Sequence, residues 1–471
     1  MITCSMPQAL SYNYLKETFD RQVLFHEKAW RLSPNPLLLS EEQTDMIKQI
    51  GQACLEFYQV LDILYTRSKT GKNLLRNKEH YASWIADYYD LGKPKFLKEH
   101  NSHKVNKRST PSIIRPDLLI TEDGFALTEL DSVPGGIGLT AFLNQLYKSA
   151  GFPVIESEGG MVTGFYNAVV PENLIEQNPL VLIVVSDESA TYQPEFIWLS
   201  EQLQALGKNI HCAHPDEIKR GSSGLLWRND QKIDVIYRFF ELFDWANVSC
   251  ADIILEAVEA GEVIVSPPMK TYQEEKMSLA FFHHHALQEF WKENLSKHAF
   301  KLLQKIIPQT WIVDPVELPP SAVLDAPWVN GKPIYEWMQL ADASQKERSW
   351  ILKTSGFHES AWGARSVVYG SDSSRLEWEK ALRKAITQSS SSLSVLQEYK
   401  KPVLLTHEVY DETGTQLIAQ NGRVRLCPYF YINNEQSELS GILSTLCPAD
   451  KKIIHGMSDA CLTPCMTQHE R

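Results

Sequence analysis

Hydrophobic side chains recur with a helical period in the first part of the chain. Between residues 41 and 65 they are spaced three or four positions apart, at Ile47, Ile50, Cys54, Leu55, Tyr58, Leu61 and Leu64. This spacing places them on one face of an α-helix. Residues 101–108 are polar and basic and predict a loop. We therefore expect residues 1–110 to form a helical N-terminal region.

A different pattern begins near residue 176. Residues 180–185 form a continuous apolar run, as expected of a buried parallel strand. Further strands and helices then alternate, with strands predicted at 209–212, 233–238 and 262–265 and helices at 194–206 and 251–261. This alternation favours an open α/β sheet. We predict a small Rossmann-like domain over residues 176–266, without a dinucleotide, because it lacks a GxGxxG loop.

The pattern changes again after residue 266. Glu274-Glu275-Lys276 begins a predicted helix that runs to about residue 291. Strands are predicted beyond it at 350–353, 366–369, 395–399 and 422–429. The last of these carries Arg423 and Arg425, which share one face because alternate residues of a strand point the same way.

Three carboxylates fall on two neighbouring strands of a predicted hairpin. Glu129 and Asp131 are two positions apart and point to the same face. Asp117 lies across a turn at 122–124, whose residues suit a hairpin. These carboxylates, with Arg115 beside them, would repel one another without a cation. Such oxygen ligands select Mg²⁺, which usually bridges nucleotide phosphates. The pattern predicts a metal–nucleotide site, and it is equally typical of a salt-bridged surface hairpin.

Composition narrows the class of protein. The 471 residues are 43% hydrophobic and 10% aromatic, which is enough for a large globular core. A formal net charge of -12 argues against nucleic-acid binding, which needs a basic surface. We see no apolar run long enough to cross a bilayer and no secretory leader. Eight cysteines without a CxxC pair predict reduced thiols. We therefore expect a cytoplasmic protein with neither nucleic-acid nor membrane partners.

Two glycine-rich segments follow predicted strands. Residues 134–138 let the backbone approach a ligand or another segment closely. Residues 354–365 follow Lys353, and an ammonium beside a Gly/Ser loop is an arrangement that holds phosphates. Gln397-Glu398 ends a strand about forty residues later and could read the amino group of adenine. Lys353 before a Gly/Ser loop is by itself weak evidence for a nucleotide site. It carries more weight together with the strand that ends in Gln397-Glu398.

The order of these features resembles that of circularly permuted ATP-grasp proteins. This group includes glutathionylspermidine synthase, eukaryotic glutathione synthetase and uncharacterised bacterial relatives. The motifs that carry the resemblance are Arg115-x-Asp117, Glu129-x-Asp131 followed by Pro-Gly-Gly, Glu274-Glu275-Lys276, Ile-Leu-Lys353 and Gln397-Glu398. The synthases have Asn where this chain has Asp131, and Asp is a competent Mg²⁺ ligand.

The resemblance implies an α+β fold of the circularly permuted ATP-grasp type with an inserted Rossmann-like domain. Residues 111–175 would carry the metal-binding strands at the front of the chain. Residues 267–471 would supply the remaining ATP-grasp lobes, with the phosphate-binding lysines, a lid loop and the adenine hinge.

The resemblance also assigns roles to individual residues. The Mg²⁺ ligands would be Asp117, Glu129 and Asp131. The catalytic cations would be Arg115 and Arg425, the latter preferred to Arg423. The ATP-binding residues would be Lys276, Lys353, Ser355, Gly356, Gly363, Gln397, Glu398 and Tyr399. Arg238 could bind a substrate carboxylate and Glu241 an amine, although an ion pair of Arg238 with Glu241 or Asp244 is at least as consistent.

The implied activity is that of an ATP- and Mg²⁺-dependent ligase. It would join a small-molecule or peptide carboxylate to an amine through an acyl phosphate. Two alternatives remain open at this stage. One is phosphoryl transfer to a different acceptor, and the other is a catalytically silent nucleotide-binding scaffold. The retained carboxylates and both lysines weigh against the scaffold.

Overall fold

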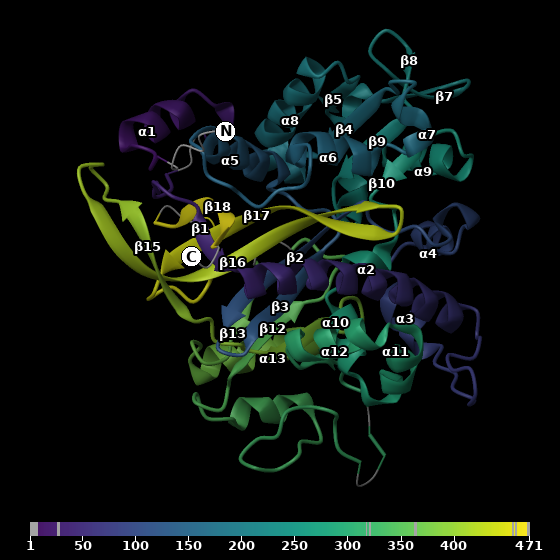
Figure 1. The fold of residues 1–471 in the computed structure, drawn as a ribbon. Coiled ribbons are helices and arrows are strands. Elements are labelled where there is room, and N and C mark those ends of the chain that lie inside the picture. The colour runs from purple at the N-terminus through teal and green to yellow at the C-terminus, as the bar shows by residue number, and fades with distance from the viewer. Residues whose placement is uncertain are drawn as a thin grey trace.

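Helices and several β-sheets are mixed along the chain in this computed structural model (Figure 1). The strands form a seven-stranded sheet, two four-stranded sheets and a three-stranded sheet. This mixture agrees with the α+β class expected from the sequence. The structure describes residues 8–25, 29–316, 318–319, 322–361, 365–454, 456 and 459–468.

The largest sheet joins the two ends of the chain. Its strands follow the order β1-β18-β17-β16-β2-β3, and β15 pairs with β16. The predicted hairpin is present, with Arg115 opposite Asp131 and Asp117 opposite Glu129. Its seven strands are β1 (Leu37–Ser40), β2 (Ile113–Thr121), β3 (Gly124–Asp131), β15 (Leu404–Tyr410), β16 (Leu417–Asn433), β17 (Gln436–Pro448) and β18 (Cys461–Gln468).

Helices cover both faces of this sheet (Figure 1). The long helix α2 (Glu41–Lys69) lies on one face, and α5 (Ile137–Ser149) and α6 (Gly160–Val169) lie on the other. Side chains along β16 point alternately to the two faces of the sheet, which explains why both faces are covered. Leu426 and Phe430 belong to the core cluster of α2. Their neighbours Cys427, Tyr429 and Tyr431 belong to the cluster of α5 and α6. The sheet is therefore buried on two sides.

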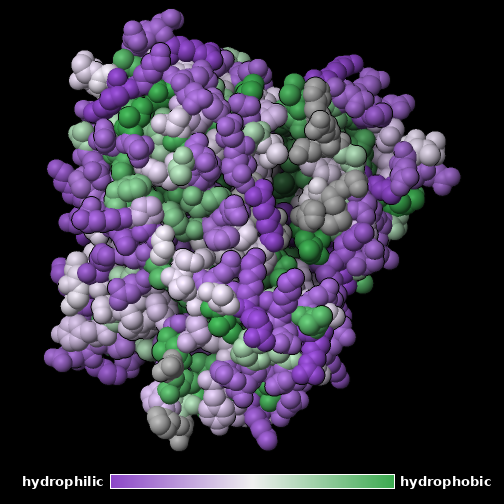
Figure 2. Space-filling view, turned by 180° about the vertical axis from the view of Figure 1, so that it is seen from behind, coloured by the Kyte–Doolittle hydropathy of each residue, from purple (hydrophilic) through white to green (hydrophobic). Residues whose placement is uncertain are grey.

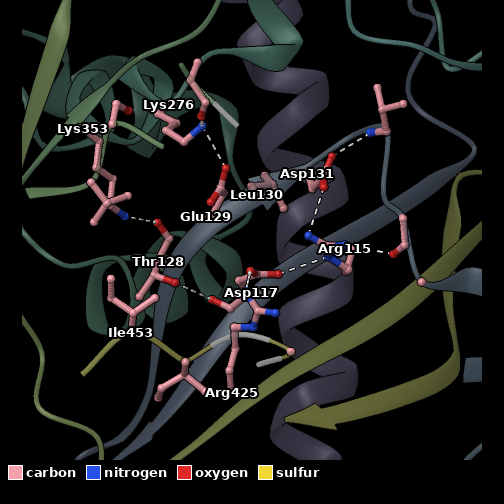
Figure 3. Close-up of a pocket in the computed structure, with 18 of the residues that line it drawn as sticks. Arg115, Asp117, Thr128, Glu129, Leu130, Asp131, Lys276, Lys353, Arg425 and Ile453 are labelled. Carbon is pink, nitrogen blue, oxygen red and sulfur yellow. Dashed lines mark hydrogen bonds and ion pairs between the residues drawn. The ribbon is translucent and has the colours of Figure 1, made fainter. Parts of the chain in front are cut away.

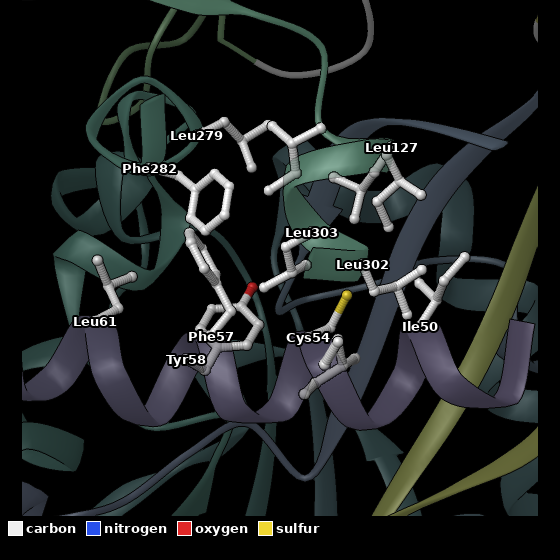
Figure 4. Packing of buried hydrophobic residues seen from close by; sticks show 14 of the residues in the cluster. Ile50, Cys54, Phe57, Tyr58, Leu61, Leu127, Leu279, Phe282, Leu302 and Leu303 are labelled. Carbon is white, nitrogen blue, oxygen red and sulfur yellow. The ribbon is translucent and has the colours of Figure 1, made fainter. Parts of the chain in front are cut away.

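The helix α2 forms where the apolar period predicted it. Ser40 caps its first turn in a capping box with Gln43, and acidic residues in that turn suit the helix dipole. Its apolar face packs against α10 (Met277–His283), α12 (Lys297–Ile306) and β3, as Figure 4 shows. The residues in contact there include Ile50, Cys54, Phe57, Leu61, Leu127, Leu279, Phe282, Leu302 and Leu303.

A parallel sheet of four strands lies beyond α5 and α6. Its order is β10-β9-β4-β5, and the predicted strands are all present. A small antiparallel sheet that the sequence did not predict is inserted between β5 and β9. These elements are β4 (Val181–Val185), α8 (Gln193–Ala205), β5 (Ile210–Ala213), β6 (Lys219–Gly221), β7 (Gly224–Trp227), β8 (Gln231–Lys232), β9 (Val235–Phe239), α9 (Ala251–Glu259) and β10 (Ile264–Ser266).

The second four-stranded sheet carries Lys353 and the predicted hinge. Its order is β11-β14-β12-β13, and α13 (Arg375–Gln388) packs on it. Trp378 and Leu382 of α13 share a core cluster with Leu352 and Leu396 of the sheet. The strands are β11 (Thr310–Val313), β12 (Trp350–Thr354), β13 (Val368–Tyr369) and β14 (Ser394–Glu398).

The single helix predicted from Glu274 to about residue 291 is wrong. The chain instead forms a 3₁₀ turn at Thr271–Glu274, then α10, a second 3₁₀ turn at His285–Leu287 and α11 (Gln288–Asn294). His284 is extended, with a ψ of 125°, and its ring accepts a hydrogen bond from the Ala286 N–H. This local capping bond ends α10, and apolar spacing alone does not reveal it.

Shorter helices complete the fold. These are α1 (Tyr12–Asp20), α3 (Trp84–Asp90), α4 (Lys95–Asn101) and α7 (Glu172–Ile175). Further 3₁₀ turns occur at Val23–Phe25, Lys104–Asn106, Asp187–Tyr192, Pro215–Glu217, Leu242–Asn247 and Trp337–Asp342.

One face of the molecule is drawn in space-filling form in Figure 2. The face shown in Figure 2 is mostly hydrophilic, with hydrophobic side chains in patches between the polar ones. Within the described ranges, no helix has both the length and the apolar character needed to cross a membrane. No disulfide joins the cysteines in this part of the chain.

The contact between α2 and β16 depends on a glycine. A Cβ atom on Gly51 would lie 2.2 Å from the ring of Phe430, which is fully buried. We predict that Gly51→Ala lowers the free energy of unfolding by about 1–3 kcal/mol through overpacking. Helix propensity alone would favour alanine by ~1 kcal/mol. Urea denaturation measures the change, and adding Phe430→Leu should restore part of it. A Gly51→Ala protein of wild-type stability would contradict this close approach.

Candidate active site

A cavity of about 560 Å³ lies where the large sheet, the Lys353 sheet and the end of β9 meet. It is lined by most of the residues that the sequence predicted for the site. These are Arg115, Asp117, Glu129, Asp131, Glu241, Lys276, Lys353, Gly356, Gln397, Glu398, Tyr399 and Arg425. Six separate stretches of the chain, at 115–131, 241, 276, 353–356, 397–399 and 425, therefore contribute predicted residues to one cavity.

Guanidinium groups bind two of the hairpin carboxylates (Figure 3). Arg115 lies between Asp117 and Asp131, with Nε 3.1 Å from Asp117 Oδ1 and Nη2 3.0 Å from Asp131 Oδ2. Arg425 reaches the other oxygen of Asp117, with an Nη1–Oδ2 distance of 3.1 Å. Asp117 is only 4% exposed. Burial disfavours its ionised form, but the two guanidiniums outweigh burial and hold the pKa of Asp117 below its usual value.

The repulsion among the carboxylates is relieved by cations of the protein itself. Lys276 Nζ lies 2.9 Å from Glu129 Oε1, so each of the three carboxylates has a cationic partner. No group of three His, Cys, Asp or Glu side chains in the described ranges is arranged to hold a metal ion. Cations of the protein therefore offset these carboxylates in the absence of a metal ion, and the assignment of the three carboxylates as Mg²⁺ ligands stays a prediction. Burial and Glu129 nevertheless raise the pKa of Asp131.

Lys353 differs from the other cations because it faces neutral oxygens. Its ammonium donates to Gln397 Oε1 at 2.9 Å and to the Thr128 carbonyl at 3.2 Å. Burial lowers the pKa of Lys353 to about 8, against weaker attraction from Glu129. A buried ammonium without a direct carboxylate contact is suited to an anionic ligand.

The predicted hinge is fixed between two strands. The Glu398 N–H donates to Gln309 O at 2.8 Å, and the Tyr399 N–H donates to Ser349 O at 2.9 Å. These two N–H donors are therefore used within the protein and are not available to a ring nitrogen of adenine, whereas oxygen atoms of this segment could still accept from the adenine amino group. Tyr399 packs edge-on against Tyr369, with ring centroids 5.9 Å apart.

Several predicted residues do not face the cavity. Arg238 is fully buried and pairs with Glu274, with an Nη2–Oε1 distance of 2.7 Å. It also donates to the backbone carbonyls of Pro267 and Pro268. The predicted contact with a substrate carboxylate is therefore corrected to a structural ion pair, and its partner is Glu274 rather than Glu241 or Asp244.

Three further predictions concern residues around the cavity. Ser355 is 1% exposed and donates to Glu275 Oε2, so it lies beneath the cavity wall. Arg423 donates to the carbonyls of Ala449 and Lys451, whereas Arg425 faces Asp117. Gly363 lies outside the described residues.

Sequence reasoning missed residues that the fold brings to the cavity. Glu241 lines it as predicted, but its wall also includes Tyr192, Glu274 and Ile453. Glu274 faces Glu241, and burial together with this neighbouring carboxylate raises the pKa of Glu241 well above its ordinary value. Ile453 comes from the loop after β17, where no motif marks it.

The glycines after β3 allow other segments to approach closely, and Gly135 and Gly136 also line the cavity. Glu195 of α8 accepts hydrogen bonds from the Gly136 and Leu139 N–H groups, at 2.6 and 3.0 Å. A Cβ atom on Gly138 would lie 2.3 Å from Glu195 O. Close approach of another segment is therefore observed at Gly136 and Gly138, and approach of a ligand to Gly135 and Gly136 stays a prediction.

Comparisons with known proteins found structural neighbours but no sequence relatives. No protein-family model matches the chain, and no curated protein matches its sequence. A glutathione synthetase-like effector from Globodera pallida, solved in its apo form, is 12% identical with a TM-score of 0.49, and the match covers 92% of this chain and 89% of that one. A candidate γ-glutamylcysteine synthetase from Methylobacillus flagellatus is 12% identical with a TM-score of 0.39, over 88% and 84%. Both TM-scores are below 0.5, so function is inferred from the residues of this chain.

Asp117 should be essential for the stability of the site. Asp117→Asn would leave the guanidiniums of Arg115 and Arg425 buried with less compensation, and we predict a loss of about 3–5 kcal/mol in unfolding free energy. Asp123→Asn, in the exposed turn of the same hairpin, should change it by no more than about 0.5 kcal/mol. Urea denaturation of both variants tests this difference, and equal effects would exclude the proposed charge network.

Proposed function

We propose that the cavity binds ATP with Mg²⁺ and that the protein is an ATP-dependent ligase joining a carboxylate to an amine. One observation carries this proposal. Lys276 and Lys353, from distant parts of the chain, lie beside the carboxylate hairpin in a single cavity. The same cavity is bordered by the strand end at residues 397–399.

The charges and shape suit a nucleoside triphosphate. Lys276, Lys353, Arg115 and Arg425 would offset the phosphate charge, since ammonium and guanidinium groups form strong bonds with phosphate oxygens. Apolar and aromatic side chains line the same cavity near the hinge and suit a purine ring. They include Ile351, Tyr369, Tyr399 and Ile453.

Glu129 and Asp131 suit a nucleotide-bound Mg²⁺. Their side chains are 37% and 25% exposed, and both line the cavity. Mg²⁺ on a nucleotide usually needs only one or two carboxylates, together with phosphate oxygens and water. Asp117 would then orient Arg115 and Arg425 rather than bind the ion. When bound, Mg²⁺ neutralises phosphate charge and polarises the transferred group.

The arrangement of the sheets supports a circularly permuted ATP-grasp fold. The carboxylate strands β2 and β3 come early in the chain, and the sheet with Lys353 and the hinge comes late. The cavity lies between these two units. The same proposal divides the chain into domains after residues 110, 175 and 266. It includes the inserted Rossmann-like domain.

The chemistry follows from bringing two anions together. A substrate carboxylate would attack the γ-phosphate of ATP, releasing ADP and forming an acyl phosphate. Arg115 and Arg425 would reduce the repulsion between carboxylate and phosphate. An amine would then attack the acyl carbon, form the amide and release inorganic phosphate. Glu241, beside Glu274, is proposed to receive the amine.

Turnover assays test the reaction class. The protein would be incubated with ATP, Mg²⁺ and paired sets of carboxylic acids and amines, and ADP and phosphate release would be measured. A ligase releases both only when an acid and an amine are present together. Transfer of labelled γ-phosphate into a stable product would instead show a phosphoryl transferase. No stimulated release, with ATP bound, would indicate a silent scaffold.

The pKa of Lys353 predicts how ATP affinity depends on pH. Its value of about 8 in the ligand-free protein means that the ammonium is charged below this pH and loses its proton above it. ATP affinity should be steady below pH 8 and fall by up to about tenfold per pH unit above it. Calorimetric titration with ATP measures this profile.

Variants identify Lys353 as the group responsible. Lys353→Met should weaken ATP binding about ten- to a hundredfold and remove the decline that begins near pH 8. Lys380→Met, on the exposed side of α13, should retain both the affinity and the pH profile. The assignment of Lys353 fails if its variant keeps the wild-type profile.

A further inference from the structure

A buried ion pair beside the cavity has no role in the proposed reaction. Lys93 Nζ lies 2.6 Å from Glu275 Oε1, and the two side chains are 1% and 3% exposed. Lys93 follows α3 in the N-terminal region, and Glu275 directly precedes the cavity residue Lys276. Burying two charges costs desolvation that their attraction often fails to recover. The pair is therefore poorly explained as a device for stability alone.

The second oxygen of Glu275 holds the chain just after Lys353. Ser355 Oγ donates to Glu275 Oε2 at 2.5 Å and accepts a bond from the Met277 N–H at 2.9 Å. The Lys276 N–H donates to Ser355 O at 3.1 Å. These bonds join the segment that carries Lys276 to the end of the strand that carries Lys353.

Gly356, the next residue, is packed closely against the same carboxylate, and Phe357 after it has an unusual backbone conformation. A Cβ atom on Gly356 would lie 2.8 Å from Glu275 Cδ, so a larger residue would collide with it. Phe357 has a φ of 45°, a left-handed conformation that is strained for a bulky residue. Such strain persists where surrounding contacts fix the backbone.

Lys93 contributes to these contacts as well. Its ammonium lies 5.7 Å from the centre of the Phe357 ring. The ring packs against the apolar cluster of the parallel sheet, which includes Phe240, Leu242 and Met269. Two sets of contacts therefore hold the turn at 355–357. Glu275 and Lys93 form one set, and the apolar cluster forms the other.

We propose that Glu275, held in place by Lys93, is a positioning residue that fixes the turn at 355–357 and with it the spacing of Lys276 and Lys353. This inference rests on the proposed nucleotide site, because the spacing matters only if both lysines bind one ligand. Binding groups must be held within a fraction of an ångström by the residues behind them. Through Lys93, the N-terminal helices would take part in shaping the cavity.

Two double variants separate this role from the cost of burying a charge. Lys93→Met/Glu275→Leu replaces both charges with apolar side chains and leaves Ser355 without its acceptor. Lys93→Met/Glu275→Gln also removes both charges but keeps an amide oxygen that can accept from Ser355. Replacing both members of a buried pair is often neutral for stability, so both proteins should unfold at similar urea concentrations.

Hydrogen exchange in the ATP-free protein tests the turn itself. Peptides covering residues 350–361 should exchange about tenfold faster in the leucine variant than in the glutamine variant, because only the latter keeps the Ser355 bond. Equal exchange would overturn the inference. If the leucine variant does not fold, Ser355→Ala removes the same bond while keeping the ion pair of Lys93 and Glu275, and it is compared with the wild type in the same way.

Calorimetric titration with ATP tests the link to the lysines. The leucine variant should bind ATP about tenfold more weakly than the glutamine variant. Faster exchange with equal ATP affinity would overturn the inference, since the turn would then not control the lysines. A wild-type protein that binds no ATP would refute the proposed function instead, and the exchange comparison would still decide whether Glu275 holds the turn.

Discussion

Charge compensation within a buried cavity is the constraint on which the rest of this structure depends. Asp117 is nearly inaccessible to solvent and touches two guanidinium groups, one two residues away and one 308 residues away. Arg425 reaches it because β16 pairs with β2, which sets Arg425 opposite Leu119. The carboxylate hairpin therefore cannot be completed without the C-terminal strands, and the large sheet has to unite both ends of the chain.

The same constraint explains the contrast between the two cavity lysines. Lys276 faces Glu129, and although burial opposes its charge, this carboxylate raises the pKa of Lys276. Lys353 faces the neutral oxygens of Gln397 and Thr128, and burial lowers its pKa to about 8. One lysine thus completes the protein's own charge balance, and the other retains attraction for an anion. The charges around the hairpin are therefore nearly balanced, and Lys353 adds a positive charge beside Gln397.

Local patterns in the sequence were sufficient to predict the strands of the parallel sheet, the carboxylate hairpin and the long helix, but they did not reveal β1, β11, β15, β17 or β18. The apolar run at β4 and the helical period of α2 depend on neighbouring residues, and both elements formed as expected. The break at His284 was missed because it depends on a side-chain cap rather than on apolar spacing. The pairing of β1 with β18 joins segments more than four hundred residues apart and has no local signal.

The candidate site shows the same division between local motifs and distant contacts. Many residues that line the cavity could be named from short motifs, but Tyr192, Ile453 and the partners of the charged groups could not. The three carboxylates suggested a metal by their mutual repulsion, and only the fold showed that Arg115, Arg425 and Lys276 already offset it. Arg238 looked available from its position at a strand end, yet Glu274 and backbone carbonyls occupy its donors. Charge near a predicted site is therefore informative only once each charged group has been assigned its partner. By that criterion Lys353 is the side chain whose surroundings most strongly favour an anionic ligand.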